Sequence, residues 1–139
     1  MSLMTEMVLF YTPENTERTR KLKGIFVRLG VRIRNISPEQ MGETVGFLAG
    51  LEGYGPAEAK EDFPAPAEEM LVMKNFTSRK IDELILAIRK AGLKKIELKA
   101  VVTPTNAGWT FYKLYEEIRE ERRQVLEQAE KSRENAPEA

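Results

Sequence analysis

Two short, wholly apolar runs constrain the fold more than any other feature of the sequence. Residues 7–11 read M-V-L-F-Y and residues 70–73 read M-L-V-M. A run of this length without polar alternation is typical of a strand that is buried on both faces. Each run is followed by a stretch with helical periodicity and then by a strand that mixes apolar and charged residues. The sequence therefore predicts a strand–helix–strand–helix unit that occurs twice.

The first unit is predicted to span residues 4–51. Its first helix runs from about Glu14 to Leu29 and is followed by a half-exposed strand at residues 31–36. The apolar residues of this helix lie at i, i+3, i+4 and i+7 on one face: Leu22, Ile25, Phe26 and Leu29. Ser37-Pro38-Glu39-Gln40 has the pattern of a capping box with proline at the first helical position, so a second helix is expected to continue to about Leu51.

The second unit is predicted to span residues 69–131, after a loop rich in Gly, Pro and acidic residues at 52–68. A strand, a helix, a half-exposed strand and a long C-terminal helix are expected in this order: 70–73, 77–91, 95–100 and 105 to beyond 118. Residues 132–139 are expected to form a frayed tail. The length of 139 residues fits a single domain, 1–139, with both units in one body.

The fold class that follows is α/β, with repeated βαβα units and one four-stranded, mainly parallel sheet. Strands that are apolar on both faces belong in the centre and alternating strands at the edges, which gives the order 2-1-3-4. Right-handed crossovers would then place the first and third helices on opposite faces of the sheet. In such a sheet, ligands bind at the switch point between the two central strands, outside their carboxyl ends.

A T-P-x-N tetrad occurs twice, each time between a strand and a helix: Thr12-Pro13-Glu14-Asn15 and Thr103-Pro104-Thr105-Asn106. One interpretation is helix capping, because Thr accepts a hydrogen bond from a free helical N–H and proline has no N–H to leave unpaired. The other is a small-anion site, in which helix N-termini and Asn amides bind the ligand and Trp109 forms an apolar wall. Lys74, Arg79 and Lys80, at the end of the third strand, could complement an anion at the switch point or belong to a solvated basic helix start.

Composition narrows the classes of function. The chain has no Cys and no His, which excludes disulfides, thiolate nucleophiles and the usual histidine base or metal ligand. No metal-binding pattern and no cofactor motif is present. An enzyme would need Glu14, Lys99 or Tyr11 as its acid or base, with a strongly shifted pKa. We therefore expect no catalytic residues, no metal and no cofactor.

Charge and hydropathy address partners and location. Lys+Arg and Asp+Glu both total 22, and the pI of about 6.4 argues against a dedicated nucleic-acid binder. The charges are nevertheless grouped in blocks, because residues 37–69 contain eight acidic residues and one basic residue. No apolar run has the length of a membrane helix, so we expect no membrane partner and a cytoplasmic location.

The second half resembles a known family. Residues 98–109 read L-K-A-V-V-T-P-T-N-A-G-W, and the stretch from Glu69 to about Glu121 resembles the small bacterial proteins classed as domain of unknown function 3783. The family has no assigned activity, so the resemblance implies a relationship and no mechanism. It adds Lys99 to the candidates. The predicted ligand-binding residues are Thr12, Asn15, Lys99, Thr103, Thr105, Asn106 and Trp109.

The first half is similar to the opening of glutaredoxins and arsenate-reductase-like proteins, which have a thioredoxin-like fold. V-L-F-Y-T-P-E-N and then L-G-V-R-I-R-N-I carry this resemblance. Where those proteins have their cysteines, this chain has Thr16-Glu17-Arg18-Thr19, so thiol exchange is absent. The predicted helix at 77–91 also departs from that fold, which has a simple hairpin there.

Two functions remain as hypotheses. The first is a non-catalytic α/β module that binds a small anion or a protein partner, based on the two T-P-x-N turns. The second is a structural or interaction protein that forms a homodimer through its C-terminal helix. The apolar residues on one face of that helix extend beyond the part expected to pack in the domain core: Phe111, Tyr115, Ile118, Val125 and Ala129. We call this face the helical seam.

Overall fold

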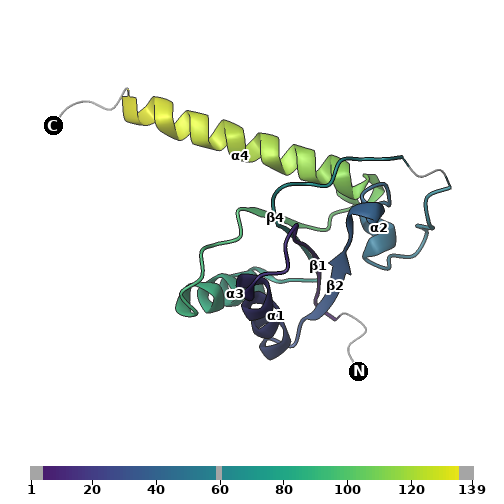
Figure 1. The fold of residues 1–139 in the computed structure, drawn as a ribbon, viewed down its shortest axis with the longest axis horizontal. Helices are drawn as coiled ribbons and strands as arrows, with labels where there is room; N and C mark the ends of the chain where they lie inside the picture. The colour runs from purple at the N-terminus through teal and green to yellow at the C-terminus, as the bar shows by residue number, and fades with distance from the viewer. Residues whose placement is uncertain (1–4, 59–60, 135–139) are drawn as a thin grey trace.

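The structure is a computed structural model that describes residues 5–58 and 61–134. Within them, one four-stranded sheet carries helices on both faces (Figure 1). The elements are β1 (Met7–Tyr11), α1 (Glu17–Arg28), β2 (Arg32–Ile36), the 3₁₀ turn η1 (Pro38–Gln40), α2 (Val45–Leu48), β3 (Met70–Lys74), α3 (Ser78–Lys90), β4 (Leu98–Val101), the 3₁₀ turn η2 (Asn106–Gly108) and α4 (Phe111–Glu134). The strand order is β2-β1-β3-β4, as the apolar runs predict.

The prediction of a mainly parallel sheet is wrong, because the sheet is mixed. β1 pairs with β2 and β3 pairs with β4 in parallel, but the two central strands run antiparallel, with Leu9 opposite Val72. A strand that is buried on both faces has the same sequence pattern whichever way it runs. The loop at 52–68 is also long enough to begin β3 at either end of β1. The carboxyl ends of β1 and β3 therefore lie at opposite edges of the sheet, and no switch point forms between them.

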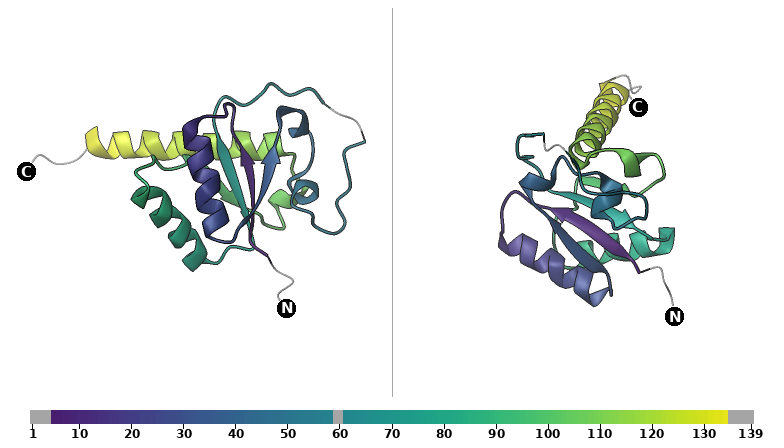
Figure 2. Two further views of the ribbon diagram at one scale, coloured as in Figure 1. Left: turned by 60° about the horizontal axis from the view of Figure 1, so that its bottom comes forward. Right: turned by 90° about the vertical axis from the view of Figure 1, so that its right-hand side faces the viewer.

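The reversed direction of β3 also changes the helix layers. α1 and α3 lie on the same face of the sheet, where the prediction had them on opposite faces (Figure 2). A rotation by 180° about an axis perpendicular to the sheet reverses the direction of the strands of a βαβ unit but keeps its helix on the same face. The two right-handed βαβ units of this chain are related in this way, so both helices lie on one face. α2, η2 and α4 cover the other face.

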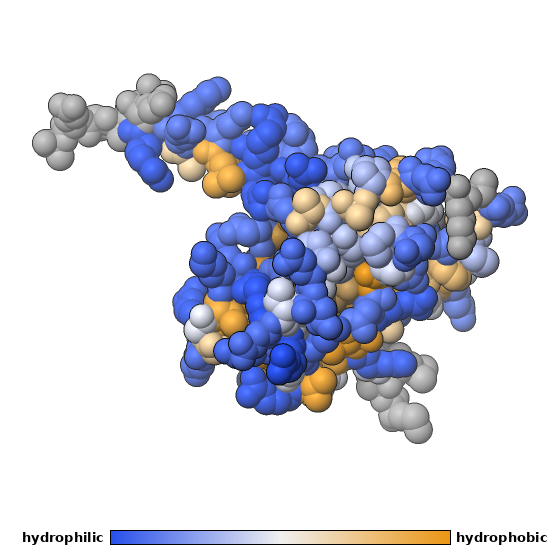
Figure 3. Space-filling model, viewed as in Figure 1, coloured by the Kyte–Doolittle hydropathy of each residue, from blue (hydrophilic) through white to orange (hydrophobic). Residues whose placement is uncertain are grey.

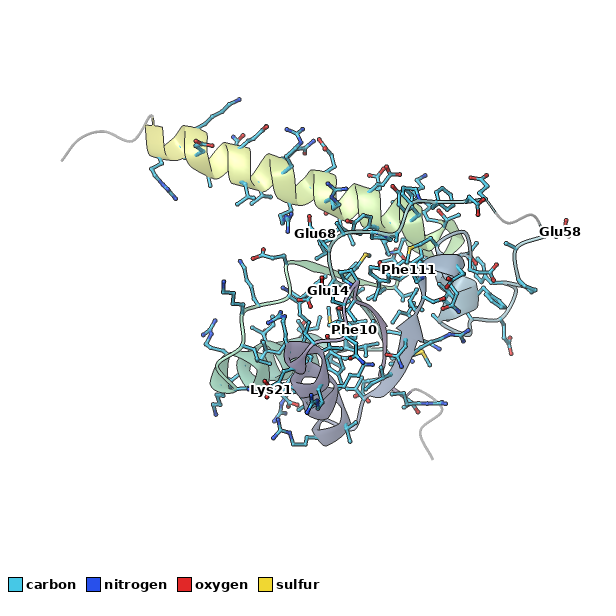
Figure 4. The ribbon with its side chains drawn as sticks, viewed as in Figure 1. Phe10, Glu14, Lys21, Glu58, Glu68 and Phe111 are labelled. Carbon is cyan, nitrogen blue, oxygen red and sulfur yellow. The ribbon has the colours of Figure 1, made fainter. Side chains whose placement is uncertain are left out.

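Two hydrophobic cores follow from the alternation of side chains along the strands. Val8 and Phe10 of β1 face α1 and α3, and the Phe10 ring meets Phe26 edge to face at 5.5 Å between centroids (Figure 4). Leu9 and Tyr11 face α2 and α4. Both faces of β1 and β3 are thus filled, which explains why these two strands contain no polar alternation. The buried Tyr11 hydroxyl donates a hydrogen bond to the Pro66 carbonyl at 2.8 Å.

Several predicted elements are shorter than the sequence pattern indicates. The expected helix at 38–51 is a 3₁₀ turn followed by the one-turn helix α2, which Thr44 caps through the backbone N–H of Phe47. Gly50 ends α2 in the left-handed conformation, with φ at 72°. The last helix begins at Phe111 rather than near Thr105, because the second T-P-x-N turn forms its own 3₁₀ turn.

The two halves repeat each other most closely after their outer strands. Ser37-Pro38-Glu39-Gln40 follows β2 and Thr103-Pro104-Thr105-Asn106 follows β4, and both tetrads have proline in second position. Each leads into a 3₁₀ turn, which begins at Pro38 in the first and at Asn106 in the second. In both, an amide side chain accepts a hydrogen bond from the first backbone N–H of the tetrad, at 2.9 Å. The structural counterpart of the second T-P-x-N turn is therefore the S-P-E-Q turn, and not the first T-P-x-N turn.

The repeat continues into the helices that follow these turns. Thr44 and Thr110 cap α2 and α4 in the same way and form an antiparallel bridge with each other. An approximate two-fold relation thus connects the halves across β1 and β3. The relation ends at Gly50, where α2 stops. Equivalent residues of the two halves are 66 positions apart, so the counterpart of Gly50 is Glu116. α4 does not stop there but continues to Glu134.

The continuation of α4 projects from the body as an arm (Figure 1). Its first turns are buried against the sheet through Phe111, Leu114, Tyr115 and Ile118. Arg122 still reaches the body, with a salt bridge of 2.9 Å to Glu68. We define the α4 arm as residues 123–134. Residues 135–139, which belong to the expected frayed tail, lie outside the described residues. No helix among the described residues has the length and apolarity to cross a membrane.

Candidate functional site

The first T-P-x-N turn follows β1 and is built by local hydrogen bonds. The Thr12 hydroxyl donates to the carbonyl of Glu14 at 2.8 Å. Asn15 is exposed, and its side chain has no hydrogen bond among the described residues. The cap of α1 is Thr16, whose hydroxyl accepts from the Thr19 N–H. This turn therefore uses Thr12 locally and leaves Asn15 in solvent.

The second T-P-x-N turn follows β4 and is closed by a reciprocal pair. The Asn106 side-chain oxygen accepts from the Thr103 N–H at 2.9 Å, and the Thr103 hydroxyl accepts from the Asn106 N–H at 3.0 Å. The Asn106 amide also donates to the carbonyl of Val101 at 2.8 Å, and the residue is only 7% exposed. Thr105 lies exposed on the outside of the turn. Asn106 therefore holds the turn together, with its side-chain oxygen and one amide N–H bonded to the backbone.

The two T-P-x-N turns do not meet. Because β1 and β3 are antiparallel and β4 is parallel to β3, the turn after β1 and the turn after β4 lie at opposite edges of the sheet. Glu14, labelled in Figure 4, marks the edge at which β1 ends. The structure thus brings Thr103, Thr105, Asn106 and Trp109 together and separates them from Thr12 and Asn15.

A cavity lies at the edge where β3 and β4 end. Its volume is about 250 Å³, and three segments line it: the chain after α2, the end of β3 and the second T-P-x-N turn. The lining residues are Leu51, Tyr54, Lys74, Asn75, Val102, Thr103, Pro104 and Ala107. The carboxyl ends of two parallel strands joined by a helix are the usual place for a ligand in an α/β fold. We name this space the Lys74 cavity.

Lys74 gives the cavity a positive charge. Its ammonium group donates to the carbonyl of Ala49 at 2.8 Å and has no carboxylate within ion-pair distance among the described residues. An ammonium has three N–H donors, so two remain for a ligand. Thr103 lines the same cavity, and its hydroxyl hydrogen has no acceptor among the described residues. A half-buried cation and a free hydroxyl thus share one concave space.

Sequence reasoning missed several residues that line this cavity, among them the polar residues Asn75 and Tyr54. Asn75 turns the chain after β3 in the left-handed conformation, with φ at 63°, and its amide donates to the Thr5 carbonyl at 3.2 Å. An asparagine directly after a strand is a turn signal that could have been noticed. The Tyr54 ring packs on Gly46, and no local pattern indicates that contact.

Trp109 and Lys99 lie away from the Lys74 cavity. Trp109 is half-buried against the core of the α4 side, and the Lys113 ammonium lies 4.7 Å from the centroid of its ring. Lys99 points to the other face of the sheet, beneath α3, where its ammonium donates to the Ile96 carbonyl. Burial lowers the pKa of Lys99, with a further contribution from the charge of Lys95.

Substituting Lys99 by methionine is expected to stabilise the fold near pH 7, by up to about 1 kcal/mol. The lowered pKa means that the charged form is less favourable in the folded chain than in the unfolded chain, where the pKa is near 10.5. The gain should shrink as the pH rises from 7 towards 11, because folded and unfolded Lys99 both become neutral. Urea unfolding across this range checks the prediction, and a gain that grows with pH would contradict it.

The groups that an enzyme would need do not converge. Burial raises the pKa of Tyr11, with a smaller contribution from Tyr115, but Tyr11 faces α4 whereas Lys99 faces α3. Glu14 lies in the turn after β1, at the opposite end of the sheet from the Lys74 cavity. The described residues contain no group of three or more Asp or Glu side chains that could hold a metal ion.

Among the comparisons with known proteins, one match covers the region that contains β3 and β4, whose ends border the Lys74 cavity. Residues 69–125 match the model of a family described as domain of unknown function (DUF3783). The match begins just before β3, ends within α4 and includes Lys74, Asn75 and Thr103, which supports the resemblance of this region. Neither the search of curated proteins nor the search of solved structures gave a match.

Proposed function

We propose that this protein is a non-catalytic α/β module that binds a small anion in the Lys74 cavity. The observation that carries the proposal is that Lys74, whose ammonium group has no carboxylate partner among the described residues, and Thr103 line one space of about 250 Å³. That volume lies just below the range of small-molecule pockets and suits a phosphate or a short carboxylate. The closed turn of Thr103 and Asn106 fixes the hydroxyl, so a ligand meets a preformed wall.

Thermal unfolding in the presence of small anions tests this function. Phosphate, sugar phosphates and small carboxylates would be screened, each at increasing concentration. A ligand at 100 times its dissociation constant adds about 2.7 kcal/mol of stability, which is a shift of roughly 5–10 °C at this size. Lys74→Gln should remove the shift, because it removes the charge while it keeps a donor.

The matched control for this screen is Lys131→Gln, which removes the same charge from the exposed α4 arm. This variant should respond to the anions like the parent protein. If no anion stabilises the parent, or if both variants lose the response equally, the small-anion function is wrong.

Self-association through the α4 arm is a second candidate function. Val125 and Leu126 are 66% and 61% exposed on the arm, and Figure 3 shows a hydrophobic patch on the projecting part of α4. They continue the helical seam of Tyr115 and Ile118 beyond the body. A second copy of the chain would cover this seam by helix pairing. Arg123 pairs with Glu120 and Glu127, which keeps the arm helical while it is exposed.

A double substitution of Val125 and Leu126 by lysine tests this candidate. If the arm mediates dimers, light scattering after size-exclusion chromatography should give a dimer mass for the parent protein at high concentration and a monomer mass for the variant. A parent protein that stays monomeric at several hundred micromolar would contradict the candidate. The thermal midpoint of the variant should stay close to that of the parent, because neither side chain packs in the core.

A further inference from the structure

The sheet separates the charges of this nearly neutral chain into two layers. On the face of α1 and α3, residues 17–28 contain five basic and one acidic residue, and residues 78–99 contain seven basic and three acidic residues. Parts of the acidic segment that precedes β3 pack on the opposite face, through residues such as Met41, Val45 and Phe63. The overall balance of charge therefore hides a basic surface, and the surface potential of a protein depends on this local distribution.

A groove crosses the basic face between the two helices. It has a volume of about 540 Å³ and is lined by Lys21, Gly24 and Arg28 of α1 and by Ala91, which follows α3. Figure 4 labels Lys21 on α1, close to α3. Lys21 and Arg28 are exposed and form no ion pair among the described residues.

Four more exposed cations lie at the end of α3 and in the loop that follows. None of them forms an ion pair within the described part of the chain: Arg89, Lys90, Lys94 and Lys95. Two neighbouring segments thus present rows of unpaired positive charge. Together, the groove and these four cations form the surface that we name the α1–α3 groove.

Gly24 leaves the floor of the groove open. It lies in the middle of α1, where glycine costs about 0.5–1 kcal/mol relative to alanine. No atom outside its own stretch of helix lies within 4 Å of the position that a Cβ would take. Packing inside this chain therefore does not require glycine there. The missing side chain leaves the backbone of α1 open between Lys21 and Arg28.

We propose that the α1–α3 groove binds the phosphate backbone of double-stranded nucleic acid. Packed helices lie about 8–10 Å apart, and the grooves of duplex DNA are about 6–12 Å wide, so the dimensions of the basic face are on the scale of a duplex. Residues 17–28 and 78–99 expose no aromatic ring on which single-stranded bases could stack. Their large exposed apolar side chains, Val27 and Leu86, lie on different helices, so they do not form the apolar face of a membrane-binding helix.

Fluorescence anisotropy with labelled 20-base-pair duplexes of DNA and RNA tests the proposal. Binding should be detectable at 50 mM salt and should weaken at least tenfold at 200 mM, because each phosphate contact releases counterions. Lys21→Glu combined with Arg28→Glu should weaken binding at least tenfold at 50 mM salt. Lys131→Glu combined with Arg133→Glu makes the same change of charge on the α4 arm and should leave the affinity within twofold.

Substitutions of Gly24 separate shape from charge. Gly24→Ala should raise the thermal midpoint, which shows that the fold does not need glycine at this position. Gly24→Gln fills the groove without a change of charge and should weaken duplex binding at least fivefold. The proposal is overturned if the parent protein does not bind duplex at 50 mM salt, if the control pair weakens binding as much as the groove pair, or if only vesicles of anionic lipid are bound.

Discussion

Replacing Asn106 by alanine is expected to lower the free energy of unfolding by about 2–3 kcal/mol. The substitution leaves the Thr103 N–H and the Val101 carbonyl without the partners that they have at 2.9 and 2.8 Å. Both groups lie in a part-buried turn, so loss of a hydrogen bond there costs more than at the surface. Urea unfolding followed by the fluorescence of Trp109 measures the change.

Asn15→Ala is the matched control for this prediction, because Asn15 has the same position in the other T-P-x-N tetrad. Its side chain is exposed and has no hydrogen bond among the described residues, so the expected change is within about 0.5 kcal/mol. Equal effects of the two substitutions would contradict the distinction between the two turns. Asn106→Ala should also weaken anion binding in the Lys74 cavity, since Thr103 loses its fixed position.

Replacing Gly46 by alanine is expected to destabilise the fold by about 1–3 kcal/mol. A Cβ at this position would lie 2.6 Å from the Tyr54 ring and 2.9 Å from the backbone oxygen of Ala107. Both residues line the Lys74 cavity, so the clash moves two of its walls. Because alanine favours a helix over glycine by about 0.5–1 kcal/mol, any net loss of stability reports the clash itself.

Gly42→Ala provides the control for this second prediction. Its Cβ would meet its nearest neighbours at 3.6 Å, which is ordinary van der Waals contact. We expect a change within about 0.5 kcal/mol for Gly42→Ala and, for Gly46→Ala, a lower thermal midpoint together with weaker anion binding. A Gly46→Ala variant that is as stable as the parent would show that Tyr54 and η2 move at no cost.

The sequence predicts the order of the strands but not the direction of β3. The order follows from burial, because Met7–Tyr11 and Met70–Met73 are apolar throughout and the outer strands alternate. Direction leaves no such trace, since a strand buried on both faces has the same pattern when it is reversed. Because the direction of β3 was predicted wrongly, the predicted placement of the first and third helices on opposite faces and the predicted switch point are wrong as well.

The candidate site was predicted in part for similar reasons. Thr103 and Asn106 belong to a local motif, and local hydrogen bonds within a tetrad can be foreseen from spacing. That Thr12 and Asn15 lie at the other edge of the sheet depends on the direction of β3. Tyr54 lines the Lys74 cavity because its ring packs on Gly46. This contact comes from tertiary packing, and no pattern in the neighbouring sequence indicates it.

A titration of ¹⁵N-labelled protein with inorganic phosphate, followed by heteronuclear NMR, tests the central claim most directly. The account predicts saturable shifts of the backbone amides of Asn75, Val102 and Thr103, which line the Lys74 cavity, and their loss in Lys74→Gln. Amides at Thr12 and Asn15 should not move. Saturable shifts confined to Thr12 and Asn15, or no saturable shift at any residue, would contradict the assignment of an anion site to the Lys74 cavity.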